Sequence, residues 1–130
     1  MIQILQKEAS LADTVSDAII VLAEGERLHL PPGSASLKKN ITASLTRMNY
    51  GGQRGELIQI NPSSTPVIIS GCGSDGSFYA RNIEQAAAAA IRFGLRQGYQ
   101  DFIIAGYASS SETKQKQWTR LIARGAMLGT

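Results

Sequence analysis

Three closely spaced glycines are the feature of the sequence that most invites a chemical interpretation. Gly71, Gly73 and Gly76 follow an apolar run, Val67 to Ser70, and precede an alanine-rich segment. The spacing GxGxxG between a strand and a helix is that of a dinucleotide-binding turn, in which the backbone must come close to a pyrophosphate. The pattern alone therefore suggests a nucleotide site.

A dinucleotide site also needs an acidic residue at the end of the following strand, where it holds the ribose hydroxyls. The next predicted strand, Phe102 to Gly106, is followed by no acid until Glu112, which belongs to the next predicted helix. Asp75 lies inside the turn, where its carboxylate would repel a pyrophosphate. We therefore interpret the three glycines as a tight turn and predict no cofactor-binding residue.

Cys72 is the second candidate, because a thiol near a helix N-terminus has a lowered pKa and can act as a nucleophile. It would need a base, and the single histidine, His29, lies far away in the sequence after an apolar run. We interpret His29 as a half-buried loop residue and predict no catalytic residue. One histidine and one cysteine also give no recognisable zinc motif, so no metal-ligating residue is predicted.

Length and composition indicate one domain over residues 1–130. A chain of 130 residues with 43% apolar residues is the size of one ordinary globular domain with one core. No apolar stretch is long enough for a membrane span, and Met1 to Lys7 lacks the basic-then-apolar order of a signal peptide. We therefore expect a cytoplasmic protein. The net charge of +3 is too mild to decide on a partner.

Apolar runs and breaker residues predict the strands. The expected strands are Ile2 to Leu5, Ala18 to Ala23, Glu56 to Ile60, Val67 to Ser70 and Phe102 to Gly106. The third and fourth are close enough in sequence to be neighbours. The last two are expected to be parallel, because the helix between them is long enough for a right-handed crossover.

Helical spacing predicts three helices. The first begins after a cap at Ser34 or Ser36, carries Leu37, Ile41, Leu45 and Met48, and ends near Asn49 to Gly52. The second begins after Ser77, places Ile83, Ala87, Ala90, Ile91 and Gly94 on one stripe, and stops at Gly98. The third begins near Ser109 to Ser111 and carries Trp118, Leu121, Ile122 and Met127. This order of elements implies an α/β fold with a mixed, mostly parallel sheet flanked by helices.

Four segments resemble the N-terminal domain of the leucyl aminopeptidase, or cytosol aminopeptidase, family. They are Val67 to Gly73, Arg81-Asn82 at the start of the alanine-rich helix, Asp101 to Ala105, and Ala123 to Gly129. The resemblance covers most of the chain and implies a three-layer sandwich like that of the macro domain. Related macro domains bind ADP-ribose, which would need an acidic residue near the end of an early strand and a glycine-rich diphosphate loop. Asp13 and Asp17 precede their strand rather than follow it, so ADP-ribose is only a minor alternative here.

The resemblance also implies that the family's peptidase chemistry lies in a different domain. The family's peptidase activity uses two divalent metals, zinc or manganese, held by a lysine and carboxylates that include an Asn-Thr-Asp-Ala-Glu-Gly-Arg segment in a downstream domain. No such segment lies between Met1 and Thr130. The resemblance therefore implies a non-catalytic domain that assists assembly or regulation of the enzyme. Its implied partner is the catalytic domain, and the implied assembly is a homo-oligomer, which is a hexamer in the full-length family.

Basic residues suggest an alternative function. Lys116, Arg120 and Arg124 recur at every fourth position of the last predicted helix, and Arg81, Arg92 and Arg96 share a face of the preceding one. Some bacterial leucyl aminopeptidases also bind DNA, so these six residues are candidates for nucleic-acid contact. The simpler interpretation is a solvated outer face, because such residues normally cover the outer side of helices that pack on a sheet.

Overall fold

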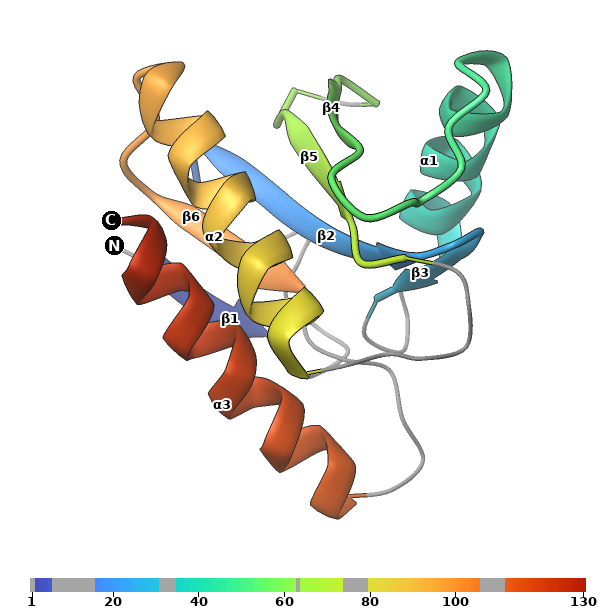
Figure 1. The fold of residues 1–130 in the computed structure, drawn as a ribbon. Helices are drawn as coiled ribbons and strands as arrows, with labels where there is room; N and C mark the ends of the chain where they lie inside the picture. The colour runs from blue at the N-terminus through green and yellow to red at the C-terminus, as the bar shows by residue number, and fades with distance from the viewer. Residues whose placement is uncertain (1, 6–15, 31–34, 63, 74–79, 106–111) are drawn as a thin grey trace.

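The structure is a computed structural model that describes residues 2–5, 16–30, 35–62, 64–73, 80–105 and 112–130 (Figure 1). The strands are β1 (Ile2–Leu5), β2 (Ala18–Glu24), β3 (Arg27–His29), β4 (Leu57–Ile60), β5 (Val67–Gly71) and β6 (Phe102–Ala105). The helices are α1 (Ala35–Arg47), α2 (Ala80–Arg96) and α3 (Glu112–Gly129). All five predicted strands and all three predicted helices are present.

The strands form one sheet in the order β1-β6-β2-β5-β4, with β3 paired to β2. The four neighbouring strands β1, β6, β2 and β5 run parallel, and β4 is antiparallel to β5. The predicted mixed, mostly parallel sheet is confirmed, as is the pairing of β4 with β5. The strands β5 and β6 are parallel as predicted, but β2 lies between them.

The short strand β3 was not predicted. Gly25, with φ 59°, turns the chain so that Arg27–His29 runs back along the last three residues of β2. His29 is therefore a strand residue, and only 1% of it is exposed. Its prediction as a half-buried loop residue was wrong, because three residues are too few to show a strand periodicity.

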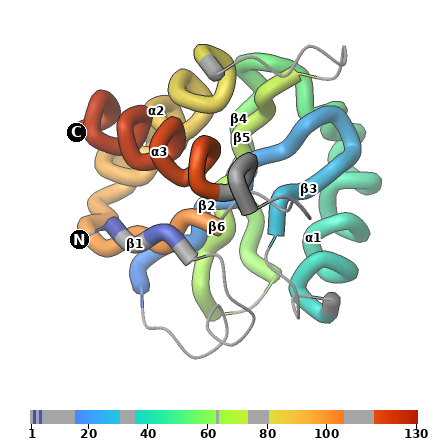
Figure 2. Tube along the Cα trace, turned by 90° about the horizontal axis from the view of Figure 1, so that it is seen from below, coloured from blue at the N-terminus to red at the C-terminus, as the bar shows by residue number. Residues whose placement is uncertain are grey.

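Helices cover both faces of the sheet. Figure 1 shows α1 on one face and α2 with α3 on the other, and Figure 2 shows the same layers from below. Along β2, Ile19 and Val21 pack in a core with Ile41 and Leu45 of α1. The alternate residues of β2, such as Ile20, pack in the core beneath α2 and α3. The alternation follows from the two-residue period of a strand.

The predicted apolar stripes are confirmed except at Met48. The stripe of α2 is buried at every predicted position: Ile83, Ala87, Ala90, Ile91 and Gly94. Gly98 has φ 91° just after α2, as expected for a helix stop. Met48 is 52% exposed, so its assignment to the buried face of the first helix was wrong, and Met127, which the last helix carries as predicted, is 75% exposed. Met48 follows the end of α1, and the buried side of α3 passes through Ile122 and Ala126 instead.

The predicted helix caps fall mostly outside the described residues. This applies to Ser34, Ser77 and Ser109–Ser111, whereas Ser36 lies inside α1.

Two glycines of α3 bring it close to α2. A Cβ atom built on Gly125 would overlap the carbonyl oxygen of Glu84, and one on Gly129 would meet the carbonyl oxygen of Ala88. The two glycines are four residues apart, so they lie on the same side of α3. They therefore allow the backbones of the two helices to approach closely, as both figures show.

Loops pack tightly at the carboxyl ends of β2 and β5. A Cβ atom on Gly71 would overlap the carbonyl oxygen of Gln53, and one on Gly52 would overlap that of Gly25. The amide of Gly73 donates to the carbonyl oxygen of Gly52 at 3.1 Å, and Gly73 has φ 110°. Glycine is thus favoured at position 71 by the neighbouring backbone and at position 73 by its positive φ, whereas Gly76 lies outside the described residues.

This packing predicts different costs for two glycine substitutions. Gly52 and Gly98 both have positive φ, 66° and 91°, but only at Gly52 would a Cβ atom meet another atom. Both Gly52→Ala and Gly98→Ala should strain the backbone by about 1–2 kcal/mol. Gly52→Ala should lose roughly 1–3 kcal/mol more, because Gly25 must move. Urea unfolding of the two variants measures the difference, and equal losses would contradict the close contact.

Candidate functional site: a cleft beside α2

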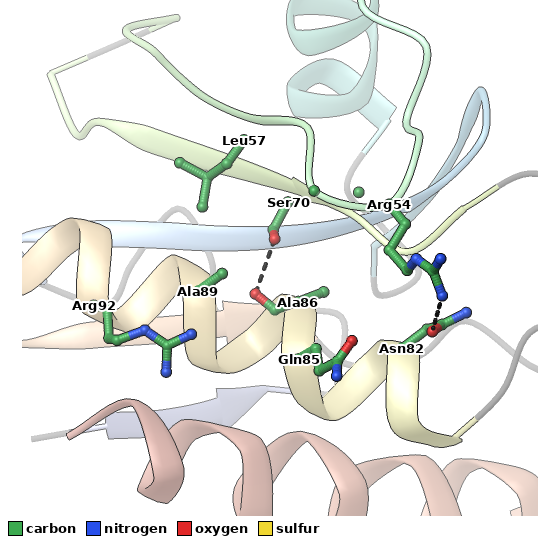
Figure 3. A pocket seen from close by; sticks show the side chains of 10 residues that line it. Arg54, Leu57, Ser70, Asn82, Gln85, Ala86, Ala89 and Arg92 are labelled. Carbon is green, nitrogen blue, oxygen red and sulfur yellow. Dashed lines mark hydrogen bonds between the residues drawn. The ribbon is translucent and has the colours of Figure 1, made fainter.

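A cleft of about 300 Å³ lies between α2 and the sheet edge formed by β4 and β5 (Figure 3). Its walls come from the loop before β4, from β4 and β5, and from one side of α2. The lining residues are Arg54, Gly55, Leu57, Ser70, Gly71, Asn82, Gln85, Ala86, Ala89 and Arg92. A volume of this size is at the lower end of the range for small-molecule pockets.

The helical wall of the cleft follows from residue spacing. Its positions on α2 are 82, 85, 86, 89 and 92, which lie three, four, seven and ten residues after the first and therefore share one side of the helix. The floor there is formed by Ala86 and Ala89, whose short side chains leave the space open. Ser70 Oγ donates a hydrogen bond of 2.8 Å to the carbonyl oxygen of Ala86 and so ties β5 to this side of α2.

Among the described residues, the lining carries positive charge and no acidic side chain. Arg54 and Arg92 supply two guanidinium groups, and the other polar side chains of the lining are neutral. Arg54 Nη1 donates to Oδ1 of the buried Asn82 at 3.5 Å, the long end of the hydrogen-bond range. An arrangement of two guanidinium groups and amides suits oxyanions, which accept paired N–H donors.

The acids nearest in sequence to the lining residues interact elsewhere. Glu56 Oε1 accepts a hydrogen bond of 2.9 Å from the amide of Gln53. Glu84 Oε1 lies 3.7 Å from Nε of Arg124, on the side of α2 that meets α3. Among the described residues, Arg92 makes no ion pair. The described walls of the cleft therefore do not neutralise its positive charge.

Cys72 does not have the environment of a nucleophile. It is 1% exposed in the core beneath α2, and its amide donates to the carbonyl oxygen of Ala23 at 2.7 Å. Burial, with a smaller contribution from Glu24, raises the pKa of the Cys72 thiol to about 12. The group is thus a protonated thiol at neutral pH, and the lowered pKa that a helix N-terminus would give is not found.

His29 is buried beside an acid. Its Nε2 lies 3.4 Å from Oε1 of Glu24, at the end of β2. Burial, with a smaller contribution from Arg27, lowers the pKa of His29 to about 4. The imidazole is therefore neutral at pH 7. Among the described residues, no group of three or more histidine, cysteine, aspartate or glutamate side chains is placed to hold a metal ion.

The six candidate residues for nucleic-acid contact are all exposed. They are Arg81, Arg92 and Arg96 on α2, and Lys116, Arg120 and Arg124 on α3. The two helices lie side by side, so the structure brings the two sets onto adjacent elements (Figure 2). Arg92 also lines the cleft, and Arg124 faces Glu84. The contact with nucleic acid stays a prediction.

Sequence reasoning missed three of the polar residues in the cleft: Arg54, Asn82 and Gln85. Arg54 and Asn82 are 28 positions apart, and no local pattern joins them. One weak signal was available, since Arg54 stands among glycines, in Gly51-Gly-Gln-Arg-Gly55, directly before a strand. Such loops are common places for functional side chains.

Comparison with known proteins shows the fold. No family model matches the sequence, and no curated protein matches it. The structure is similar to that of a mutant tomato leucine aminopeptidase, with a TM-score of 0.66 and 17% sequence identity. The match covers 99% of this chain and 28% of that one, so the chain spans little more than a quarter of the enzyme's length. None of the described helices is long and apolar enough to span a membrane.

The environment of His29 predicts a pH dependence of stability. Its folded pKa, about 4, lies below the ordinary 6.5, so the unfolded chain takes up the proton first as pH falls. The contribution of neutral His29 is complete above pH 6.5 and is lost towards pH 4. The loss approaches about 1.4 kcal/mol per pH unit, roughly 3 kcal/mol in all.

Urea unfolding at several pH values between 7 and 4 measures this loss, with His29→Gln as the comparison. The relevant quantity is the slope of the free energy of unfolding against pH, because the substitution also changes the stability at pH 7. Parallel slopes for the two proteins would show that His29 titrates normally.

Proposed function

We propose that this chain is a non-catalytic accessory domain of a leucyl aminopeptidase, serving assembly or regulation of the enzyme. The observation that carries the proposal is the fold shared along 99% of the chain with part of a tomato leucine aminopeptidase. The two divalent metals of the reaction would belong to the catalytic domain, which is the proposed partner together with further copies in a homo-oligomer. A cytoplasmic location is part of the same proposal.

Two features of the structure support an accessory role. Two of the four segments that carry the family resemblance, Val67 to Gly73 and Ala123 to Gly129, serve close backbone packing, as their glycines show. At the end of α3, Met127 and Leu128 are 75% and 65% exposed. Adjacent exposed apolar side chains of this size are typical of surfaces that another protein covers. We assign this end of α3 as the contact with a second copy or with the catalytic domain.

An activity assay tests the catalytic part of the proposal. The purified chain is incubated with a leucine amide and Mn²⁺ or Zn²⁺, and a complete leucyl aminopeptidase serves as positive control. Turnover should not exceed that of the metal ions alone, because the family's metal-binding segment is missing. Turnover that follows this polypeptide through purification and is lost on heating would overturn the proposal.

Light scattering on the same preparation tests the assembly part. We expect a species heavier than the 13.9 kDa monomer at high protein concentration. Leu128→Glu should reduce it at least about tenfold, since a charge then enters the apolar contact. Met48→Glu is the matched control, because Met48 is also exposed but lies beside α1. A monomer at every concentration, or equal effects of both variants, would contradict self-assembly through α3.

The second candidate function is contact with the backbone of duplex DNA through α2 and α3. Its support is the exposure of all six basic side chains on two adjacent helices. Such contacts depend on charge and release counterions, so affinity should fall steeply with salt.

Fluorescence anisotropy of a labelled duplex at several salt concentrations tests this alternative. Replacing Arg96, Lys116 and Arg120 with glutamine should weaken binding and lower the salt slope by about one unit for each phosphate that is no longer neutralised. The matched control replaces Lys38, Lys39 and Arg47 of α1, which carry the same charge on the opposite face of the sheet. No binding at low salt, or equal losses of DNA affinity for both variants, would contradict DNA contact through α2 and α3.

A further inference from the structure

We propose that the cleft beside α2 binds an elongated organic dianion, with one oxyanion near Arg54 and the other near Arg92. The inference goes beyond the accessory role and does not depend on it. It rests on the charge of the lining and on the apolar floor of the cleft. It also rests on the separation, in the direction of the α2 axis, between Arg92 on α2 and Arg54 in the loop before β4 (Figure 3).

The charge of the cleft calls for an anionic ligand. Two guanidinium groups line a space that no acidic side chain in the described part of the chain lines. The acids on the neighbouring elements are held elsewhere, Glu56 at the amide of Gln53 and Glu84 at Arg124. The contact of Arg54 with Asn82 is long, 3.5 Å, so an incoming oxyanion would replace a weak neutral acceptor with a charged one.

The positions of the arginines favour two anionic groups. Asn82, which receives Arg54, and Arg92 are ten residues apart on α2, a rise of roughly 15 Å along the helix axis. In Figure 3, the Arg54 side chain reaches the Asn82 end of the cleft and the Arg92 side chain lies towards the other end. A single carboxylate or phosphate would contact one guanidinium group well, whereas a dianion of sufficient length contacts both.

The floor of the cleft defines the body of the ligand. Leu57, Ala86 and Ala89 lie between the two arginines, and Gln85 adds an amide at the rim. These short apolar side chains fit a narrow hydrocarbon chain. None of the described lining residues is aromatic, so this part of the cleft offers no stacking platform for a nucleobase.

The test is a titration of the full chain at constant ionic strength, followed by NMR shifts of backbone amides. The probes are suberate, octanoate of the same carbon number, and fructose bisphosphate. We expect saturable shifts at Gly71, Asn82 and Ala89, and a dissociation constant for suberate about tenfold below that for octanoate, because one further charge-assisted contact forms. Tighter binding of the bisphosphate would identify phosphates as the natural oxyanions; tighter binding of suberate would identify carboxylates.

Variants locate the two ends of the ligand. Arg54→Gln and Arg92→Gln should each reduce the affinity of the preferred ligand to that of its counterpart with one anionic group, octanoate or a monophosphate of the same sugar. Arg96→Gln is the matched control, because Arg96 lies one turn further along α2, is also exposed and is outside the described lining. The proposal is overturned if neither suberate nor fructose bisphosphate binds more tightly than octanoate, or if Arg96→Gln causes the same loss as the two cleft variants.

Discussion

The central strand β2 is the constraint on which the rest of the structure depends. Its residues from Ala18 to Ala23 are buried, so both of its faces must be covered. One edge of β2 pairs with β5, and the other is shared by β6 and β3. Each large apolar side chain buried in this way contributes about 1.5–3 kcal/mol, which is lost if either layer of helices is absent. A three-layer arrangement is the consequence of this single apolar strand.

The layer formed by α2 and α3 depends on small residues. Gly125 and Gly129 admit the backbone of α2, and Ala87 and Ala90 bring α2 close to the sheet. Short side chains on α2 allow close packing where the helix faces the core. Where α2 instead faces the edge of the sheet, short side chains leave space. Beside β4 the wall consists of Ala86 and Ala89, and the result is the cleft. The cleft is thus a by-product of the packing that α2 requires, with its charge supplied by arginines at either end.

Much of this fold could be predicted from the sequence because its periodic signals are long. The apolar run of β2 and the stripe of α2 from Ile83 to Gly94 reflect burial directly. The three residues of β3 carry no comparable signal, and Met48 matched a helical spacing although α1 had already ended at Arg47. The cleft could not be predicted at all, since Arg54 meets Asn82 only after β4 has paired with β5 and α2 has packed on the sheet.

The glycine turn shows how one local pattern can serve different purposes. Glycine allows close approach of any group to the backbone, whether a pyrophosphate or another loop. At Gly71 the approaching group is the carbonyl of Gln53, from the loop that also carries Arg54. The absence of a side chain at Gly71 therefore allows this loop to lie against the end of β5, which positions Arg54 beside α2. The motif that suggested a ligand site thus contributes indirectly to the proposed anion site, by fixing the loop that carries a charged side chain of the cleft.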